Sequence, residues 1–263
     1  MTRVAIVTGG TRGIGRAVSA AFLQQGVHVT AVYAADREAA AAFEAESKSL
    51  SGELLTMQAD VGDAAEIRRV VDETVSRWGR VDFLINNAAI SRFAFLDEMT
   101  ESFLDETIRV NLKGPILMTQ AVLPHMKAQR FGRIVNASSI SGHYADVGQV
   151  AYGSSKAGIE MMTKLAAAEL GPYGITVNAY APGIIATDMT RAMIEDRGDV
   201  QLRQVPLGEF GKPEDVAGLV MYLCSDAGRY VTGEIIGIDG GMLRAQNPFR
   251  AIDRAAEDRP ESR

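Results

Sequence analysis

The amino-acid sequence predicts an α/β domain in which a doubly wound parallel sheet of about seven strands carries helices on both faces. Short runs rich in β-branched residues alternate with longer stretches of helical periodicity along most of the 263 residues. Several of these runs are apolar at consecutive positions, as in strands that are buried on both faces. The first run leads directly into a glycine-rich turn and then into a helical pattern, which is the order of a βα unit.

The expected strands follow one another at regular intervals along the chain. In order they cover residues 4–7, 27–33, 53–59, 81–88, 133–138, 174–181 and 233–241. Helical patterns fill the intervals, including 16–26, 37–46, a long helix from about Ala151, a mixed-polarity stretch over 186–211 and the apolar pattern from Val216. We therefore expect one Rossmann-type domain over residues 1–242.

Residues 243–263 are expected to form a charged, flexible tail. After Gly241 the sequence exchanges apolar residues for arginines and carboxylates, and nothing in the pattern ties this end down. An alternative hypothesis is that Pro248 and Phe249 anchor the tail on a neighbouring subunit.

The composition excludes several classes of protein. A formal charge of −6 gives no general surface for nucleic acid or for an anionic membrane. The first apolar run is too short for a signal-peptide core and no 18-residue apolar span follows, so we expect a cytoplasmic protein with neither kind of partner. Cys224 lies in an apolar helical pattern typical of a core residue. The three histidines are scattered without ligand spacing, so no metal site is expected.

The glycine-rich turn "GGTRGIG" is a candidate phosphate-binding site. Gly9, Gly13 and Gly15 allow a tight turn and a close approach of backbone to phosphate, and the following helix offers free N–H groups at its start. The spacing is Gly-x-x-x-Gly-x-Gly. A structural turn without a ligand is the alternative interpretation.

The end of the second strand favours NADP(H) over NAD. An NAD site needs a carboxylate there for the ribose hydroxyl, whereas a 2′-phosphate needs cations. Tyr33 stands at the expected position, and Arg12 and Arg37 are available to a phosphate. Asp36 is the counter-candidate, although it also fits the N-cap of the following helix.

Tyr152 and Lys156 stand four residues apart in "AYGSSKAG", which places a phenol and an ammonium on one helix face. A protonated tyrosine suits proton donation to a ketone oxygen, and a neighbouring cation favours its phenolate. The alternative is two neighbouring surface side chains.

The motifs "TGGTRGIG", "NNAA", "NASS", "YGSSK" and "PGIIAT" together resemble the short-chain dehydrogenase/reductase family from about residue 3 to 242. The resemblance implies that Tyr152 is the catalytic proton donor, tuned by Lys156. It implies that Ser139 orients the carbonyl and that Asn111 supports the proton relay. From the residues alone, Ser138 fits as well as Ser139, and Asn111 could be a helix-kink residue.

The resemblance also implies a set of cofactor contacts in the glycine turn, at the strand ends and in a strap over the nicotinamide. They are Gly9, Thr11, Arg12, Gly13, Ile14, Gly15, Tyr33, Arg37, Asp60, Val61, Asn87, Ala88, Tyr152, Lys156, Pro182, Gly183, Ile185 and Thr187.

Within the family, "ATDMTRAM", "GRIVNASS" and "VTGEIIGIDGGM" are most similar to 3-oxoacyl-[acyl-carrier-protein] reductases. This similarity implies a ketone substrate on acyl carrier protein, which would dock near Arg130 in a basic cluster with Lys127 and Arg133 by the cleft. Tyr173 occupies the second docking position of that subfamily. The alternatives are a reductase of a CoA-linked, polyketide or free cyclic ketone, and a dinucleotide sensor without turnover.

The family resemblance further implies a homotetramer in which the long helix packs against its symmetry mate. Ile159, Met162 and Leu165 fall at helical spacing, which fits either a core or an interface. In the stretch 186–211, expected to form a lid over the substrate, Met189, Met193 and Ile194 fit either a pocket wall or simple packing.

Overall fold

Seven parallel strands form one sheet in the order β3-β2-β1-β4-β5-β6-β7 in the computed structural model, which describes residues 2–242, 244 and 246–257. The strands are β1 (Val4–Thr8), β2 (His28–Tyr33), β3 (Leu54–Gln58), β4 (Phe83–Asn86), β5 (Gly132–Ala137), β6 (Ile175–Pro182) and β7 (Ile235–Ile238). All six pairings are parallel. The predicted fold class and the number of strands are confirmed.

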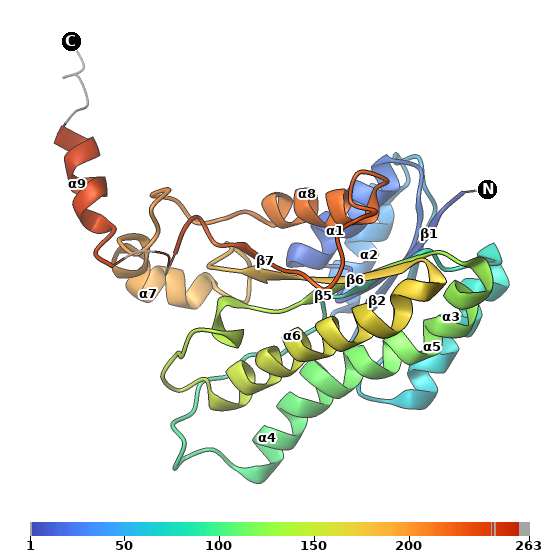
Figure 1. The fold of residues 1–263 in the computed structure, drawn as a ribbon, viewed down its shortest axis with the longest axis horizontal. Helices are drawn as coiled ribbons and strands as arrows, with labels where there is room; N and C mark the ends of the chain where they lie inside the picture. The colour runs from blue at the N-terminus through green and yellow to red at the C-terminus, as the bar shows by residue number, and fades with distance from the viewer. Residues whose placement is uncertain (1, 243, 245, 258–263) are drawn as a thin grey trace.

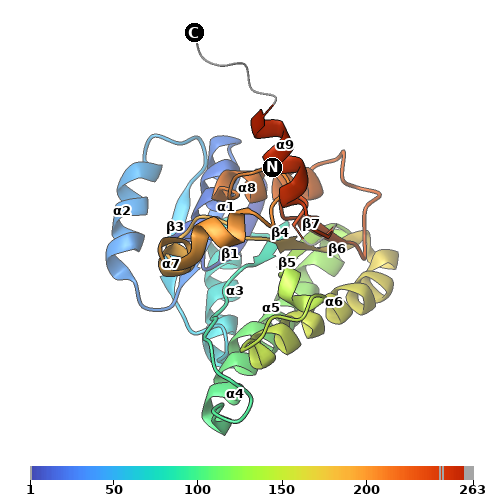
Figure 2. The same cartoon turned by 90° about the vertical axis from the view of Figure 1, so that its left-hand side faces the viewer.

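Helices cover both faces of the sheet, as Figures 1 and 2 show. One face carries α1 (Gly13–Gln24), α2 (Arg37–Ser47) and α8 (Pro213–Cys224), and the other carries α3 (Ala64–Trp78), α5 (Gly114–Gln129) and α6 (Val150–Leu170). Outside these layers lie α4 (Glu101–Ile108), α7 (Arg191–Leu202) and α9 (Phe249–Glu257). No helix in the described part of the chain is long and apolar enough to cross a membrane.

The core explains why the strand sequences are apolar at consecutive positions. All five residues of β1 are buried. Val7 packs in the same cluster as Phe22 of α1, whereas its neighbour Ile6 packs with Val122 of α5 on the other face. Since successive side chains of a strand point to opposite faces, both sets must be apolar. Cys224 is buried in the first of these clusters, as predicted.

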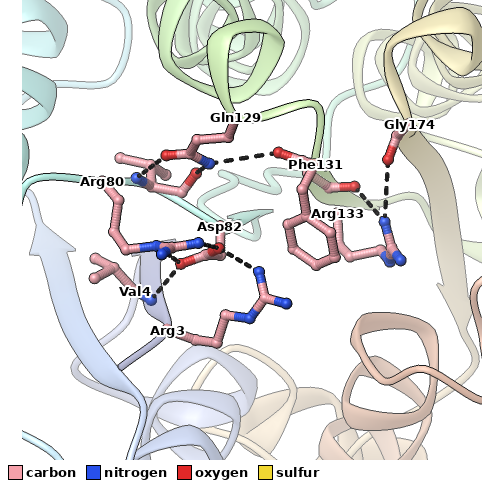
Figure 3. Close-up of polar contacts among 10 residues, drawn as sticks. Arg3, Val4, Arg80, Asp82, Gln129, Phe131, Arg133 and Gly174 are labelled. Carbon is pink, nitrogen blue, oxygen red and sulfur yellow. Dashed lines mark hydrogen bonds and ion pairs between the residues drawn. The ribbon is translucent and has the colours of Figure 1, made fainter. Parts of the chain in front are cut away.

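A buried carboxylate fastens the amino edge of the sheet (Figure 3). Asp82 is 0% exposed and accepts hydrogen bonds from Arg3 Nη1 at 2.7 Å, from Arg80 Nη2 at 2.6 Å and from the Val4 backbone N–H at 2.9 Å. Two cations neutralise it, which offsets the cost of burying its charge. These bonds tie the start of β1 to the start of β4.

The tail contains a helix that the sequence analysis did not predict. Helix α9 leaves the body of the molecule beside α7 (Figures 1 and 2). Arg203 lies over the Phe249 ring, 5.2 Å from its centre, and Nη2 of the same arginine is 3.2 Å from Asp253 Oδ2. Phe249 therefore contacts its own chain. The flexibility of 243–263 stays a prediction, and residues 243, 245 and 258–263 lie outside the described part.

Candidate active site

The residues predicted to bind cofactor and substrate gather at the carboxyl ends of the strands. They follow β1, β2, β3, β4, β5 and β6, and the strand order reverses between β1 and β4. In open α/β sheets, ligands bind in the crevice at such a reversal. The fold therefore brings the predicted residues to one edge of one sheet.

The turn between β1 and α1 requires its glycines. Gly9 and Gly13 adopt φ values of +64° and +53°, in the left-handed region. A Cβ on Gly15 would lie 2.0 Å from the Gly9 carbonyl oxygen, so a side chain at this position would force the turn apart. Thr11 within the turn is buried, and Ile14 packs against the core.

The start of α1 differs from the starts of α2, α3 and α4. Asp36, Asp63 and Thr100 cap α2, α3 and α4 with their side chains. Helix α1 has no side-chain cap, and no acidic residue stands in its first turn. Its first N–H groups and its positive dipole end are thus available to an anion at the crevice.

Asn87 holds the glycine turn in place. Its Nδ2 donates to the carbonyl oxygens of Thr8 and Gly9, at 2.9 and 3.3 Å, and its Oδ1 accepts from the Tyr180 hydroxyl at 2.8 Å. The Thr8 hydroxyl accepts from the N–H groups of Asn87 and Ala88, at 2.9 and 3.0 Å. Sequence reasoning found Asn87 and Ala88 but missed Thr8 and Tyr180.

The ends of β2 and β3 carry the side chains that bear on the choice of cofactor. Tyr33 is the last residue of β2. Asp36 caps α2 by accepting from the Ala39 N–H at 2.9 Å, as expected, and its other oxygen is 4.0 Å from Arg12 Nη1. Both side chains of that pair are largely exposed, so the ion pair is weak. Arg37 Nε donates to Gln58 at the end of β3.

Asp60 and Val61 follow β3 directly. Val61 is buried, and Asp60 Oδ2 accepts from Arg109 Nη1 at 2.6 Å while its Oδ1 accepts from the Gly62 N–H at 2.8 Å. Arg109 opens the helical turn that contains Asn111. The salt bridge thus couples the end of β3 to that turn.

Asn111 lies in a π-helical turn, Arg109–Lys113, between α4 and α5. Such turns interrupt α-helices and are frequent at functional sites. The buried amide accepts from the Ile90 N–H and donates to the Ile90 carbonyl, both at 2.8 Å, and also donates to Ser155 Oγ at 3.2 Å. The π-helical turn interrupts the helical path at Asn111, and the amide also contacts α6 through Ser155.

Ser139, Tyr152 and Lys156 come together beside the end of β5. The Ser139 side chain hydrogen-bonds with Tyr152 and also accepts from the Ser141 N–H at 3.1 Å. Ser138 Oγ donates to Glu160 on α6 at 2.8 Å instead. The geometry therefore distinguishes the two serines, which the sequence left as alternatives, and it adds Glu160 and Ser155 to the residues that sequence reasoning missed.

Burial controls the two titratable groups of this cluster. It raises the pKa of Tyr152, against a smaller lowering by the bond with Ser139. It lowers the pKa of Lys156 to about 8. Lys156 Nζ lies 5.4 Å from the centre of the Tyr152 ring and donates to the Ala137 carbonyl at 2.7 Å. The lowering of the Tyr152 pKa by Lys156 stays a prediction, and in this arrangement the ammonium donates to the backbone of β5.

The segment after β6 lies over the glycine turn. A Cβ on Gly183, which follows Pro182, would lie 2.9 Å from Asp239 Cα, so the backbone is closely packed there. Ile185 is buried, and a Cβ on Gly13 would lie 3.6 Å from the Thr187 methyl group. An open cavity of about 590 Å³ between α1, α7 and α8 is lined by residues that include Gly13, Thr187 and Ile194.

The basic cluster does not lie where the sequence analysis expected it. Lys127 and Arg130 stand at the end of α5, and Arg133 at the start of β5, which is the amino edge of the sheet. Tyr152 stands at the carboxyl edge, and β5 alone spans about 20 Å. Arg133 is 6% exposed, because its guanidinium stacks on Phe131 and donates to backbone carbonyls (Figure 3). The expectation of three cations beside the cleft of the same chain is wrong.

Comparison with known proteins gives matches over nearly the whole length. The model of the family described as enoyl-(acyl carrier protein) reductase matches residues 9–243. The 3-oxoacyl-[acyl-carrier-protein] reductase FabG of Thermotoga maritima is 44% identical over 241 residues, which cover 92% of this chain and 98% of the relative. The reductase of the same name from Staphylococcus aureus is 42% identical over 242 residues, with the same coverage of both chains.

Two solved structures share the fold. The crystal structure of gox2181 superposes with a TM-score of 0.87 at 33% identity, covering 93% of this chain and 96% of that one. The crystal structure of a dehydrogenase/reductase from Sinorhizobium meliloti 1021 gives a TM-score of 0.86 at 35% identity, covering 92% of this chain and 95% of that one. Because of these matches, and because the site residues gather at the carboxyl ends of the strands, the chain belongs to the short-chain dehydrogenase/reductase family and is an oxidoreductase that interconverts a ketone and an alcohol.

Proposed function

We propose that the protein reduces a ketone to a secondary alcohol with NADPH, and that its substrate is a 3-oxoacyl thioester on acyl carrier protein. The observation that carries this proposal is the cluster of Ser139, Tyr152 and Lys156 at the carboxyl edge of β5, next to the glycine turn. The names of the relatives support the substrate class.

The crevice fits a dinucleotide. The tight packing at Gly15 and the uncapped start of α1 suit a pyrophosphate, with Gly9, Thr11 and Gly13 around it. Arg12 and Arg37 flank the end of β2, where Asp36 is engaged as a helix cap, and this favours a 2′-phosphate. The segment from Pro182 to Thr187 would cover the nicotinamide. When bound, the cofactor supplies the hydride.

The residues of the chain handle the oxygen and the proton. A phenol whose pKa is raised by burial is protonated at neutral pH, so Tyr152 can donate to the ketone oxygen. Ser139 would donate a hydrogen bond to the same oxygen as negative charge develops on it. Lys156 keeps a positive charge near the phenol below about pH 8 and stabilises the phenolate left after transfer. Asn111 supports the proton path by fixing Ile90 and Ser155 next to this cluster.

The carrier protein would dock on the cations at the end of α5, where Arg130 is exposed and Lys127 is half-buried. Lys127 Nζ lies 4.4 Å and the Arg130 guanidinium 5.8 Å from the centre of the Tyr173 ring, so the three form one surface. Since this surface and Tyr152 lie at opposite sheet edges, docking there would serve the site of another subunit. The proposal therefore needs an oligomer, and we propose the homotetramer that the family resemblance implies. Ile159 is buried in its own chain, but Leu165 is 57% exposed on α6 and is available to an interface. We further propose a cytoplasmic location.

The test measures NADPH oxidation with acetoacetyl groups on carrier protein and on coenzyme A. Tyr152→Phe should abolish turnover while NADPH binding, followed by fluorescence, stays within about threefold of wild type. Retained turnover in this variant would contradict the mechanism. Equal kcat/KM values on the two carriers would favour a CoA-linked substrate over the carrier protein.

A further inference from the structure

Glu160 stands on α6 one helical turn after Lys156, and its carboxylate contacts the segment that carries Ser139. Glu160 Oε1 accepts from Ser138 Oγ at 2.8 Å and lies 2.9 Å from His143 Nδ1. Because a carboxylate only accepts hydrogen bonds, the histidine nitrogen is the donor in the second contact. Only 13% of the Glu160 side chain is exposed, so solvent screens these bonds weakly.

The two donors lie on either side of Ser139 in the sequence. Ser138 precedes it, and His143 follows the short 3₁₀ turn Ile140–Gly142 that Ser139 caps. Gly142 packs directly under the carboxylate, since a Cβ there would lie 2.6 Å from Glu160 Oε1 and 2.9 Å from Ser138 Oγ. Glu160 Oε1 therefore contacts the residues on both sides of the 3₁₀ turn, and Gly142 of the turn packs against the same oxygen.

The same turn fixes the Ser139 hydroxyl. Its Oγ accepts from the Ser141 N–H at 3.1 Å, and its carbonyl accepts from the Gly142 N–H at 2.9 Å. Tyr152, which hydrogen-bonds with Ser139, belongs to the same helix as Glu160. The position of the serine relative to the tyrosine is thus set by two links to α6, one through Tyr152 and one through Glu160.

We propose that Glu160 is a positioning residue for carbonyl reduction, which holds the Ser139 turn against α6 so that the serine and tyrosine hydroxyls meet at one point. This rests on the proposed function. A misplacement of about 1 Å at a reacting centre can cost about 100-fold in rate. A bond made mainly to the developing charge affects kcat more than KM.

The experiment compares Glu160→Leu, Glu160→Gln and the control Glu169→Leu, which changes an exposed glutamate of the same helix. Glu160→Leu should lower kcat for an acetoacetyl ester by about 10- to 100-fold, with KM and NADPH affinity within about threefold of wild type. Glu160→Gln keeps an oxygen that accepts hydrogen bonds, so its kcat should stay within about fivefold of wild type. The positioning role requires a hydrogen-bond acceptor and not a negative charge. Glu169→Leu should match wild type.

A second measurement covers the case in which Glu160→Leu does not fold. His143→Ala removes one of the two donors and leaves the carboxylate in place, and it should lower kcat by about tenfold and speed hydrogen exchange of the Gly142 N–H. Wild-type kcat in both Glu160→Leu and His143→Ala would overturn the positioning role and leave the proposed function standing. An inactive wild-type protein would instead overturn the proposed function. Normal exchange of the Gly142 N–H in the variants would show, independently of turnover, that Glu160 does not hold the Ser139 turn.

Discussion

Burial of Lys156 should make the free energy of unfolding rise with pH, and the substitution Lys156→Met should remove this rise. The side chain is 2% exposed, and burial lowers its pKa from the ordinary 10.5 to about 8. Below about pH 8 the lysine is charged in the folded and the unfolded chain alike, and its burial costs about 3 kcal/mol at about 1.4 kcal/mol per pKa unit. Between about pH 8 and 10.5 the unfolded chain binds a proton that the folded chain lacks, so stability rises with pH.

The assay is urea unfolding of wild type and Lys156→Met at about pH 7 and about pH 9.5. Linkage predicts that wild type gains about 2 kcal/mol in unfolding free energy relative to the variant over this interval. The variant also leaves the Ala137 carbonyl without its donor, but that loss does not depend on pH and cancels in the comparison.

Lys164→Met is the matched control, because Lys164 is an exposed lysine of the same helix. Its pH dependence should run parallel to that of wild type. If the wild-type and Lys156→Met curves also run parallel from about pH 7 to 9.5, the lysine does not titrate in this range and the lowering of its pKa by burial is refuted.

Four further outcomes test other parts of the structure. Arg12→Ala should reduce the preference for NADPH over NADH by about tenfold or more in fluorescence titrations, and an unchanged ratio would remove the support for NADP. Gly15→Ala should lower the unfolding free energy by about 1–3 kcal/mol and weaken NADPH binding, whereas Gly171→Ala, whose Cβ meets nothing within 4 Å, should do neither. Arg130→Glu should lower kcat/KM about tenfold at low salt for a carrier-bound ketone only, and an equal fall with the CoA ester would contradict docking at this residue. Truncation after Arg244 should preserve NADPH binding, since we propose that residues 1–242 form the complete domain, and its loss would refute that boundary.

The strands were predictable because their signal is local. Each run of β-branched residues is buried on both faces, so Ile6 and Val7 had to be apolar whatever the details of the packing. The glycine turn was equally predictable from the sequence, because a positive φ at Gly9 and the close packing at Gly15 exclude other residues.

The contacts that shape the site were not predictable from local pattern. Tyr180 reaches Asn87 across 93 positions of the chain, and Glu160 reaches Ser138 across 22. Neither residue stands in a motif, and a tyrosine in a strand or a glutamate in a helix is ordinary. The misplaced basic cluster has the same origin, because the sequence gives no sign that the end of α5 lies at the edge opposite to Tyr152.

The bonds of Asp82 at the amino edge bear on how the chain folds during synthesis. The Val4 N–H finds its acceptor 78 positions later, and β1 lies between β2 and β4 in the sheet. Strand β1 can therefore pair with β2 once both have been made, but its other side and the Val4 N–H are paired only after Asp82 and β4 have followed. Contacts of such long sequence separation form late and expose apolar strands in the interval. Strand β1 thus depends on Asp82, which is made well before any residue of α6, for the last of its backbone bonds.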